Sequence, residues 1–298
     1  MNGLTQLLGA QPPGEGTPVV FDGGMGTLLQ ERGLEGGGAG ELWNIEHPDA
    51  IRKIHTEYAE AGARVLTTNT FGGTEPRLAM HDLGDRVYDV NKAAAEIAHE
   101  VAEQHGAFVA GDLGPTGELL FPMGTMDEEQ ASALFEAQLR GLVDGGIDFV
   151  IIETMSDLAE VRAAIAAAQK VAPDLPIVAT LSFDTNLHTM MGVAPAQAVT
   201  ELAGSGVDAV GANCGRGLAE LESIMTAMVD VRPEGLLLIG QSNAGLPHLV
   251  GDRFVYDATV DDVAEHAVRL RDLGVDLIGS CCGSTPAFTA AIRDAVSA

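Results

Sequence analysis

The sequence is poor in basic residues, and in lysine above all. Its 298 residues include 16 Lys and Arg against 43 Asp and Glu, a formal net charge of −27, and only Lys53, Lys92 and Lys170 are lysines. A surface this negative repels phosphate groups, which argues against nucleic acid and anionic membranes as partners. All three lysines fall in stretches with a helical pattern. None is therefore left at a strand end for Schiff-base chemistry.

Cysteines and long apolar runs are also scarce. Three cysteines, two of them adjacent, form no disulfide framework, and reduced thiols are typical of the cytosol. No window approaches the ~18 uninterrupted apolar residues of a membrane span. The N-terminal stretch lacks the basic start and apolar run of a signal peptide. The sequence therefore predicts a soluble, cytoplasmic protein.

What the sequence does contain is a regular alternation of short apolar runs and amphipathic stretches. Four amphipathic stretches end at a glycine that is followed by an apolar run. This pattern is typical of a helix that ends at glycine and leads into a buried parallel strand. The predicted strands are Pro18–Phe21, Arg64–Thr68, Phe108–Gly111, Phe149–Ile152, Ile177–Ser182, Ala209–Ala212, Leu236–Ile239 and Asp276–Ile278. The predicted helices lie near 48–61, 86–105, 127–144, 157–171, 195–204, 217–229, 259–273 and 286–297.

Eight strands alternating with eight helices predict an α/β fold, a single-domain (β/α)₈ TIM barrel. The barrel would span residues 1–298, with 1–17 as a short N-terminal extension. An open doubly wound sheet is the competing fold, and it usually carries a glycine-rich phosphate motif after its first strand. The nearest candidate, residues 24–29, lacks the third glycine, and no P-loop lysine exists. We therefore favour the barrel.

All three cysteines follow predicted strands, and barrel chemistry sits at the C-terminal ends of strands. Cys214 follows strand six, and Cys281 and Cys282 follow strand eight, which we expect to be its neighbour. Buried cysteines without function are one alternative, and a disulfide between the adjacent pair is another. Three thiolates at ~2.3 Å suit Zn²⁺ and leave a fourth position open. Such an ion is well suited to keeping a substrate thiol deprotonated, so we infer alkyl transfer to a thiol.

Two carboxylates and three aromatic residues near strand ends are candidates for substrate binding. Asp22 and Glu153 could hold an ammonium group, or each could cap a turn or helix instead. Trp43, the only tryptophan, is a candidate wall of an aromatic cage for a quaternary ammonium. Phe71 and Phe183 are weaker candidates for the same wall. Packing in the core is the alternative for all three rings.

The segments at these positions resemble the homocysteine S-methyltransferase family. The resemblance runs from about residue 18 to 297, nearly the whole chain. It rests on Asp22–Thr27, Thr68–Gly72, Gly111–Glu118, Glu153–Thr154, Gly211–Cys214, Ser242–Gly245 and Gly279–Gly283. The spaced cysteine motifs are its most specific part.

The resemblance implies a metal site. Cys214, Cys281 and Cys282 would bind zinc, which activates the sulfur of homocysteine. In the methionine synthase branch, an asparagine in a motif like Asn243-Ala244-Gly245 fills the fourth zinc position before homocysteine arrives. Asn243 is therefore expected to be a displaceable ligand.

The resemblance also implies how homocysteine is held. Asp22 and Glu153 would bind its amino acid end, together with the backbone of the turn at Gly23 and Gly24. The product of methyl transfer to its thiol would be methionine.

The methyl donor implied by the resemblance is a small onium compound, with glycine betaine as the best candidate. Segments 41–44, 182–185 and 189–193 look most like bacterial betaine–homocysteine methyltransferases. Gly72 and Thr154 stand where the animal enzymes have tyrosines. We expect 298 residues to leave no room for folate and cobalamin modules. The alternatives are the homocysteine-activating subunit of a split cobalamin-dependent methionine synthase, fed by a corrinoid protein, and a non-catalytic zinc-thiolate barrel. A homo-oligomer stays open.

Overall fold

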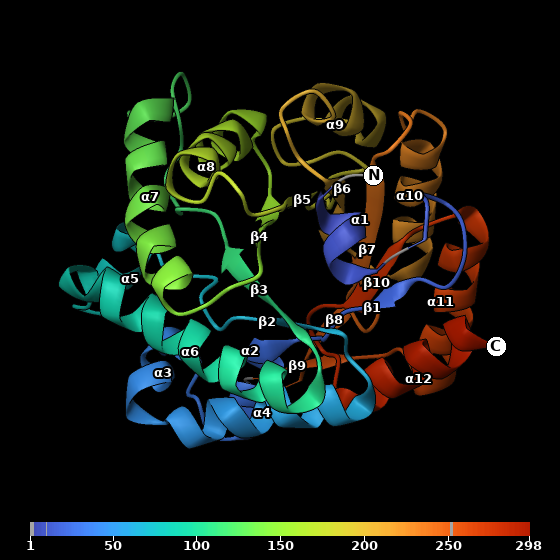
Figure 1. The fold of residues 1–298 in the computed structure, drawn as a ribbon, viewed down its shortest axis with the longest axis horizontal. Coiled ribbons are helices and arrows are strands. Elements are labelled where there is room, and N and C mark those ends of the chain that lie inside the picture. The colour runs from blue at the N-terminus through green and yellow to red at the C-terminus, as the bar shows by residue number, and fades with distance from the viewer. Residues whose placement is uncertain (1–2, 10, 251–252) are drawn as a thin grey trace.

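The computed structural model describes residues 3–9, 11–250 and 253–298, and it confirms the predicted barrel (Figure 1). Eight parallel strands lie in the order β1-β10-β7-β6-β5-β4-β3-β2. A bridge between Phe21 and Val65 joins β1 to β2 and closes the ring. The strands are β1 Val19–Val20, β2 Val65–Thr67, β3 Phe108–Leu113, β4 Phe149–Met155, β5 Ile177–Leu181, β6 Ala209–Cys214, β7 Leu237–Ser242 and β10 Leu277–Ser280.

Helices surround the strands, and several begin and end where local signals place them. α7 and α11 begin at capping boxes on Asp127 and Thr259. α4 and α11 end at Gly62 and Gly274, whose positive φ of 104° and 87° favours glycine. The larger helices are α4 Pro48–Ala61, α6 Val87–His105, α7 Glu128–Asp144, α8 Leu158–Val171, α9 Pro195–Leu202, α10 Leu218–Val229, α11 Val260–Leu273 and α12 Pro286–Ser297. The shorter elements are α1 Gly3–Leu8, α2 Met25–Glu31, α3 Trp43–Glu46, α5 Glu75–Ala79 and two 3₁₀ turns, η1 Gly40–Leu42 and η2 Gly84–Arg86.

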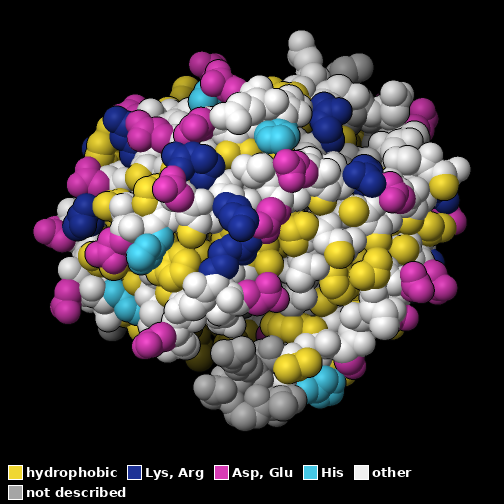
Figure 2. Space-filling view, turned by 90° about the horizontal axis from the view of Figure 1, so that it is seen from below, with side chains coloured by type: hydrophobic (Ala, Val, Ile, Leu, Met, Phe, Trp, Pro, Cys, Tyr) yellow, Lys and Arg dark blue, Asp and Glu magenta, His cyan; other side chains and the backbone are white. Residues whose placement is uncertain are grey.

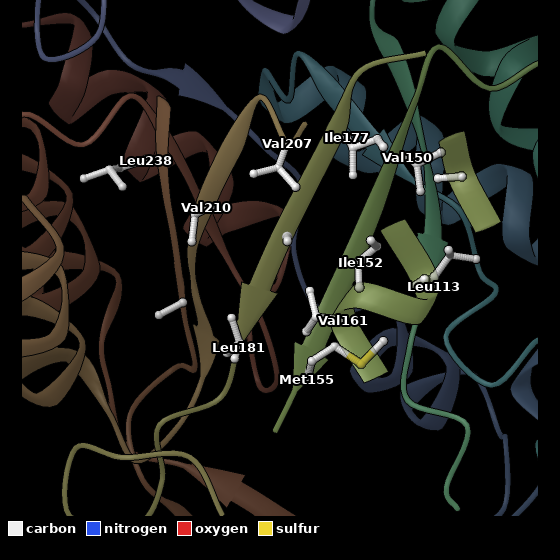
Figure 3. Packing of buried hydrophobic residues seen from close by; sticks show 14 of the residues in the cluster. Leu113, Val150, Ile152, Met155, Val161, Ile177, Leu181, Val207, Val210 and Leu238 are labelled. Atoms are coloured by element: carbon white, nitrogen blue, oxygen red, sulfur yellow. The ribbon is translucent and has the colours of Figure 1, made fainter. Parts of the chain in front are cut away.

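The strands separate two apolar cores, because successive side chains in a strand point to opposite faces. The outer core lies between strands and helices, and Figure 3 shows part of it, with Val150 and Ile152 of β4 near Val161 of α8. The inner core fills the barrel and includes Phe21 and Phe149, whose rings meet edge to face at 6.1 Å. The interior is therefore packed, and only its C-terminal end is left for chemistry.

At that end the inward positions become polar. Residues with the same inward-facing parity as the apolar interior residues continue along each strand toward its C-terminal end. They form a ring of side chains: Thr67, Asp112, Glu153, Thr180, Asn213, Gln241 and Cys281. This polar layer forms the floor of the mouth of the barrel.

The elements that were not predicted include helix α1 and a hairpin, besides α2, α3, α5, η1 and η2. Helix α1 lies within residues 1–17, the expected extension, and its Leu4 and Leu8 pack in the same cluster as the barrel interior. The antiparallel hairpin of β8 Pro247–Val250 and β9 Arg253–Tyr256 follows β7. Both are too short for periodicity to distinguish them from loops.

The surface carries mixed charges with acid in excess. In Figure 2 acidic side chains outnumber basic ones, and the basic ones lie beside acidic neighbours. Exposed pairs such as Arg52 with Glu100 at 3.2 Å contribute little to stability. Within the part of the chain that the structure describes, no helix is both long and apolar enough to cross a membrane.

His55 on α4 predicts a pH-dependent loss of stability. The side chain is fully buried, and neither ring nitrogen has a hydrogen-bond partner among the described residues. Burial lowers its pKa from 6.5 to about 4. Below pH 6.5 the unfolded chain therefore binds a proton at His55 that the folded chain does not bind. The free energy of unfolding falls as the pH drops from 6.5 to 4, and above pH 6.5 this group does not affect it.

Replacing His55 by leucine removes this penalty. Between pH 7.5 and pH 5 the free energy of unfolding of His55→Leu should gain about 2 kcal/mol relative to the unmodified protein. Urea unfolding at both pH values measures the difference, with exposed His105→Gln as the control. Identical pH profiles for His55→Leu and the unmodified protein would show that His55 is not a buried neutral group.

Candidate active site

The three cysteines converge at the C-terminal end of the barrel. Their sulfur atoms all lie within 4.8 Å of one another, with Cys214 and Cys281 2.7 Å apart and Cys281 and Cys282 3.9 Å apart. None is in a disulfide. The expectation that strands six and eight are neighbours is wrong, because β7 lies between β6 and β10. The sulfurs still meet at the C-terminal ends of β6 and β10, where the Cys281 N–H donates to the Ser242 carbonyl of the intervening β7 at 2.7 Å.

The backbone at the cysteines adopts unusual conformations. Cys214 has a φ of +58°, which is uncommon for a residue with a side chain. Gly283, directly after Cys282, has a φ of +80°, and a Cβ there would collide with the ring of Tyr256. Gly279, on the other side of the two cysteines, lies within β10 and does not have a positive φ.

Asn213, to which the sequence analysis assigned no role, holds the sulfur side of the site together. Its Oδ1 accepts hydrogen bonds from the Thr154 N–H at 2.9 Å and the Thr180 hydroxyl at 2.8 Å. Its Nδ2 donates to Thr154 Oγ1 at 2.7 Å and faces the sulfurs of Cys214 and Cys281 at 3.8 and 4.0 Å. One amide thus joins the ends of β4, β5 and β6 and points an N–H at two thiols. Its position before Cys214 was the only signal.

Asn243 braces the two cysteine loops. Its Nδ2 donates to the Gly215 carbonyl at 2.8 Å, and its Oδ1 accepts from the Cys282 N–H at 3.1 Å. The residue expected to be a displaceable ligand therefore contacts the backbone of both cysteine loops, and each end of its amide is hydrogen-bonded there.

The thiols and Tyr256 interact electrostatically. Hydrogen bonds from Cys214 and Cys281 lower the pKa of the Cys282 thiol to about 3, and the Tyr256 hydroxyl adds to this. Burial and the charge of Cys282 raise the pKa of Tyr256. The sequence analysis missed Tyr256, because it is supplied by the unpredicted hairpin. The three thiols together thus stabilise one thiolate.

A cavity of about 560 Å³ opens over the barrel mouth and joins the thiols to the predicted substrate residues. From the sequence-predicted set, its lining includes Asp22, Gly23, Gly24, Phe71, Glu153, Cys214, Cys281 and Cys282.

Two predicted aromatic residues do not line this cavity. Trp43 meets His47 edge-on at 4.7 Å and packs against the outer core. Phe183 is 1% exposed within the same core. For these two rings the structure shows the core packing that the sequence left open, whereas Phe71 does face the cavity.

Asp22 links two strands instead of capping the turn that follows it. Its carboxyl oxygens accept from the Thr67 N–H at 2.7 Å and the Thr67 hydroxyl at 2.8 Å. Burial raises its pKa to about 7, against the lowering effect of both hydrogen bonds.

Glu153 is not a helix cap either. Helix α8 is capped by Asp157, which accepts from the Ala159 N–H at 2.8 Å. Burial, followed by the charges of Cys282 and Asp22, raises the pKa of Glu153 to about 8. A carboxyl group with this shift, in a cavity, is typical of functional sites.

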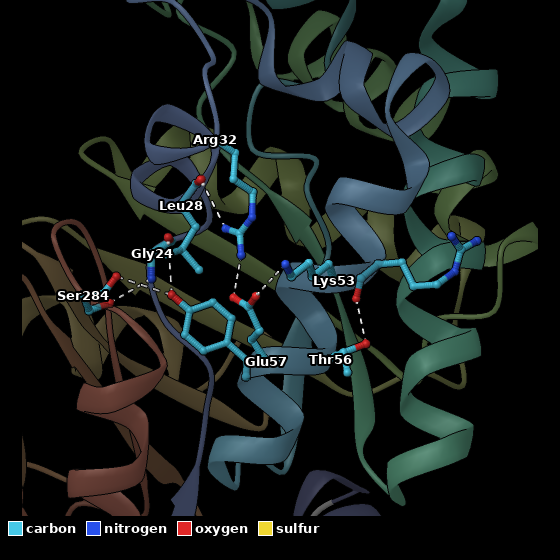
Figure 4. Close-up of polar contacts among 9 residues, drawn as sticks. Gly24, Leu28, Arg32, Lys53, Thr56, Glu57 and Ser284 are labelled. Carbon is cyan, nitrogen blue, oxygen red and sulfur yellow. Dashed lines mark hydrogen bonds and ion pairs between the residues drawn. The ribbon is translucent and has the colours of Figure 1, made fainter.

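The glycine turn packs tightly on the cysteine loop. A Cβ on Gly23 would lie 2.5 Å from Ser284 Oγ and 2.9 Å from Ser280 Oγ. The Gly24 N–H donates to Ser284 Oγ at 2.9 Å (Figure 4). Glycine is required here because two chain segments approach more closely than a side chain allows.

The three thiols share a cavity with the carboxyl groups of Asp22 and Glu153 at the C-terminal mouth of a (β/α)₈ barrel, where enzymes of this fold class carry their active sites. The chain belongs to the homocysteine S-methyltransferase family, whose model matches residues 19–296. This confirms the resemblance that the motifs suggested.

Among relatives, the chain is 32% identical over 297 residues to the methionine synthase of Mycobacterium tuberculosis. That match covers 94% of this chain but 24% of the relative, so the chain spans about a quarter of its length. Among solved structures, the chain is similar to the metallated form of the homocysteine methyltransferase MmuM from Escherichia coli. The TM-score is 0.80 and the identity 25%, with 98% of this chain and 99% of that chain covered. A methyltransferase from Methanosarcina mazei shares the fold at TM-score 0.60 and 15% identity, covering 99% of this chain and 96% of that one.

Proposed function

We propose that the protein transfers a methyl group from a small onium donor, with glycine betaine as the best candidate, to the thiol of homocysteine. Zn²⁺ held by Cys214, Cys281 and Cys282 would be the cofactor. One observation carries the proposal: three sulfurs within 4.8 Å of one another share a cavity with the buried carboxyl of Asp22 and the half-buried carboxyl of Glu153.

The cysteine cluster fits zinc. Two sulfurs each ~2.3 Å from one tetrahedral ion lie about 3.8 Å apart. The 3.9 Å between Cys281 and Cys282 matches this value, and Cys214 and Cys281 need to separate by about 1 Å. Bound Zn²⁺ would supply the acidity that keeps a substrate thiol ionised at neutral pH. Asn243, beside Cys282, is the proposed displaceable fourth ligand.

The residues around the cluster would position homocysteine. Asp22 and Glu153 would hold its ammonium group, since a cation favours the ionised form of carboxyls whose pKa burial has raised. The turn at Gly23 and Gly24 would hold the rest of the amino acid end. In the reaction the sulfur forms a bond to the methyl carbon, and the electron pair of the breaking bond returns to the donor. No proton moves at the methyl group, so orientation and exclusion of water do the work.

Charge supports a cationic donor. The cavity lining includes four carboxylates, those of Asp22, Glu41, Asp112 and Glu153, and the ring of Phe71. Carboxylates and an aromatic face both attract an onium group. With Trp43 and Phe183 in the core, we propose Phe71 as the aromatic contact.

A second candidate is the homocysteine-activating part of a cobalamin-dependent methionine synthase, which would receive the methyl group from a corrinoid protein. One observation favours this second candidate: the chain matches a segment that makes up 24% of the length of a methionine synthase. Exposed apolar side chains also occur on loops beyond the C-terminal ends of β2, β3 and β5: Met80 at 72%, Phe121 at 76% and Met190 at 70% exposure. A macromolecular donor would approach this face.

A donor screen separates these functions. Zinc-loaded protein and homocysteine would be incubated with betaine, S-methylmethionine or methylcobalamin, and methionine would be followed by mass spectrometry, with Cys214→Ala as the inactive control. Methionine from an onium donor supports the proposal, and methionine from methylcobalamin alone supports the second candidate. Zinc retained without methionine from any donor would indicate a non-catalytic zinc-thiolate barrel.

A further inference from the structure

Asp112 carries a buried carboxyl group to which the proposed function assigns no specific role. It belongs to the polar layer at the mouth of the barrel, is 2% exposed and lines the same cavity as the thiols. Within the described residues its Oδ1 has no hydrogen-bond partner. Two other members of the layer are satisfied, Thr180 by Asn213 and Thr67 by Asp22. A buried polar atom without a partner costs free energy, so a ligand that supplies one is expected.

The surroundings of Asp112 are acidic. Burial raises its pKa well above the usual range, and the charges of Glu153, Glu41 and Asp22 raise it further. These effects favour the neutral form of the Asp112 carboxyl, and a cation bound beside it would favour the ionised form.

Other unpartnered atoms in the cavity point to the same ligand chemistry. Gln241 Oε1 and Ser280 Oγ are buried, line the cavity and have no partner among the described residues. An amide oxygen and a carboxyl oxygen both accept hydrogen bonds. A cluster of free acceptors with negative charge fits a cation that donates several hydrogen bonds, such as a primary ammonium. A quaternary onium fits less well, because it has no N–H to donate.

The backbone N–H and carbonyl of Asp112 are both hydrogen-bonded, so the structural role of this residue does not depend on its side chain. Its N–H donates to Thr68 Oγ1 at 3.0 Å, and its carbonyl accepts from Thr70 Oγ1 at 2.8 Å and Gln138 Nε2 at 3.1 Å. These contacts hold β3 in place whatever side chain residue 112 carries.

We propose that Asp112 is a third carboxylate of the homocysteine site, whose Oδ1 accepts a hydrogen bond from the α-ammonium group beside Asp22 and Glu153. The inference rests on the proposed function. It assigns three carboxylates to the three N–H bonds of one ammonium group. Asp112 and Glu153 lie on the neighbouring strands β3 and β4, in the cavity that the thiols also line.

The test compares two thiols that differ only in the amino group. Binding of homocysteine and of 4-mercaptobutanoate to zinc-loaded protein would be measured by calorimetry for the unmodified protein, Asp112→Asn and Asp112→Ala. We expect the Kd of homocysteine to rise about tenfold or more in Asp112→Asn, and further in Asp112→Ala. The Kd of 4-mercaptobutanoate should change less than about twofold. Exposed Asp174→Asn is the matched control, and circular dichroism checks folding.

An equal loss for both thiols would mean that residue 112 only shapes the site, and no loss for either would mean that solvent satisfies it. Either outcome overturns the inference. Failure of the unmodified protein to bind homocysteine would instead overturn the proposed function.

Discussion

Replacing Cys281 by serine is expected to remove zinc binding and to lower the rate of methionine formation at least about a hundredfold. Cys281 is central in the cluster, since its sulfur contacts both Cys214 at 2.7 Å and Cys282 at 3.9 Å. Serine keeps the size of the side chain but cannot act as a thiolate ligand, and two thiolates do not make a stable zinc site. Metal content by atomic emission and methionine formation would be measured on the same sample.

The control for this variant is exposed Ser223→Ala, which should keep a zinc to protein ratio near one. Cys281→Ser should remain folded, because the two apolar cores that hold the barrel do not include Cys281. Full zinc content in Cys281→Ser together with undiminished methionine formation would refute the assignment of the cluster as the zinc site.

Replacing Glu153 by glutamine is expected to reduce kcat/KM for homocysteine about 10- to 100-fold, mainly through KM. Hydrogen bonds to charged groups contribute about 1.5–3 kcal/mol, and glutamine keeps the size of the side chain but loses the charge that attracts an ammonium group. Steady-state kinetics with homocysteine measures the change, and exposed Glu129→Gln serves as the control.

The same variant should be more stable than the unmodified protein when both are metal-free. Burial raises the pKa of Glu153 from 4.5 to about 8, so the folded chain holds a proton that the unfolded chain releases. The contribution of Glu153 to stability is therefore lost as pH rises from 4.5 to 8, and the gain in Glu153→Gln should be greater at pH 8 than at pH 5. Thermal unfolding at both pH values tests this. Lower stability of the variant at pH 8 would show that Glu153 supports the fold and not a ligand.

The sequence predicted the site residues that stand in motifs at strand ends. Cys214, Cys282 and Glu153 could be placed because a parallel barrel brings the C-terminal ends of all its strands to one face. The structure does bring them to one cavity. Trp43 could not be placed in the same way, because it begins the four-residue helix α3, whose direction depends on packing against the outer core.

The residues that sequence reasoning missed act through partners far away in the chain. Asn213 binds Thr154, 59 residues away, and Tyr256 comes from a hairpin of two four-residue strands. The single Oδ1 of Asp112 is notable only because no donor reaches it. Contacts between distant segments leave no periodic pattern in a sequence.

The sequence by itself determined the alternation of strands and helices, the family motifs and the strand ends that carry chemistry, because these depend on local periodicity and on side chains adjacent in the chain. Only the tertiary structure decided that β7 separates the two cysteine strands, that Trp43 and Phe183 face the core, and which buried acceptors have no partner. These outcomes depend on how distant segments pack, and packing is settled by the whole chain at once.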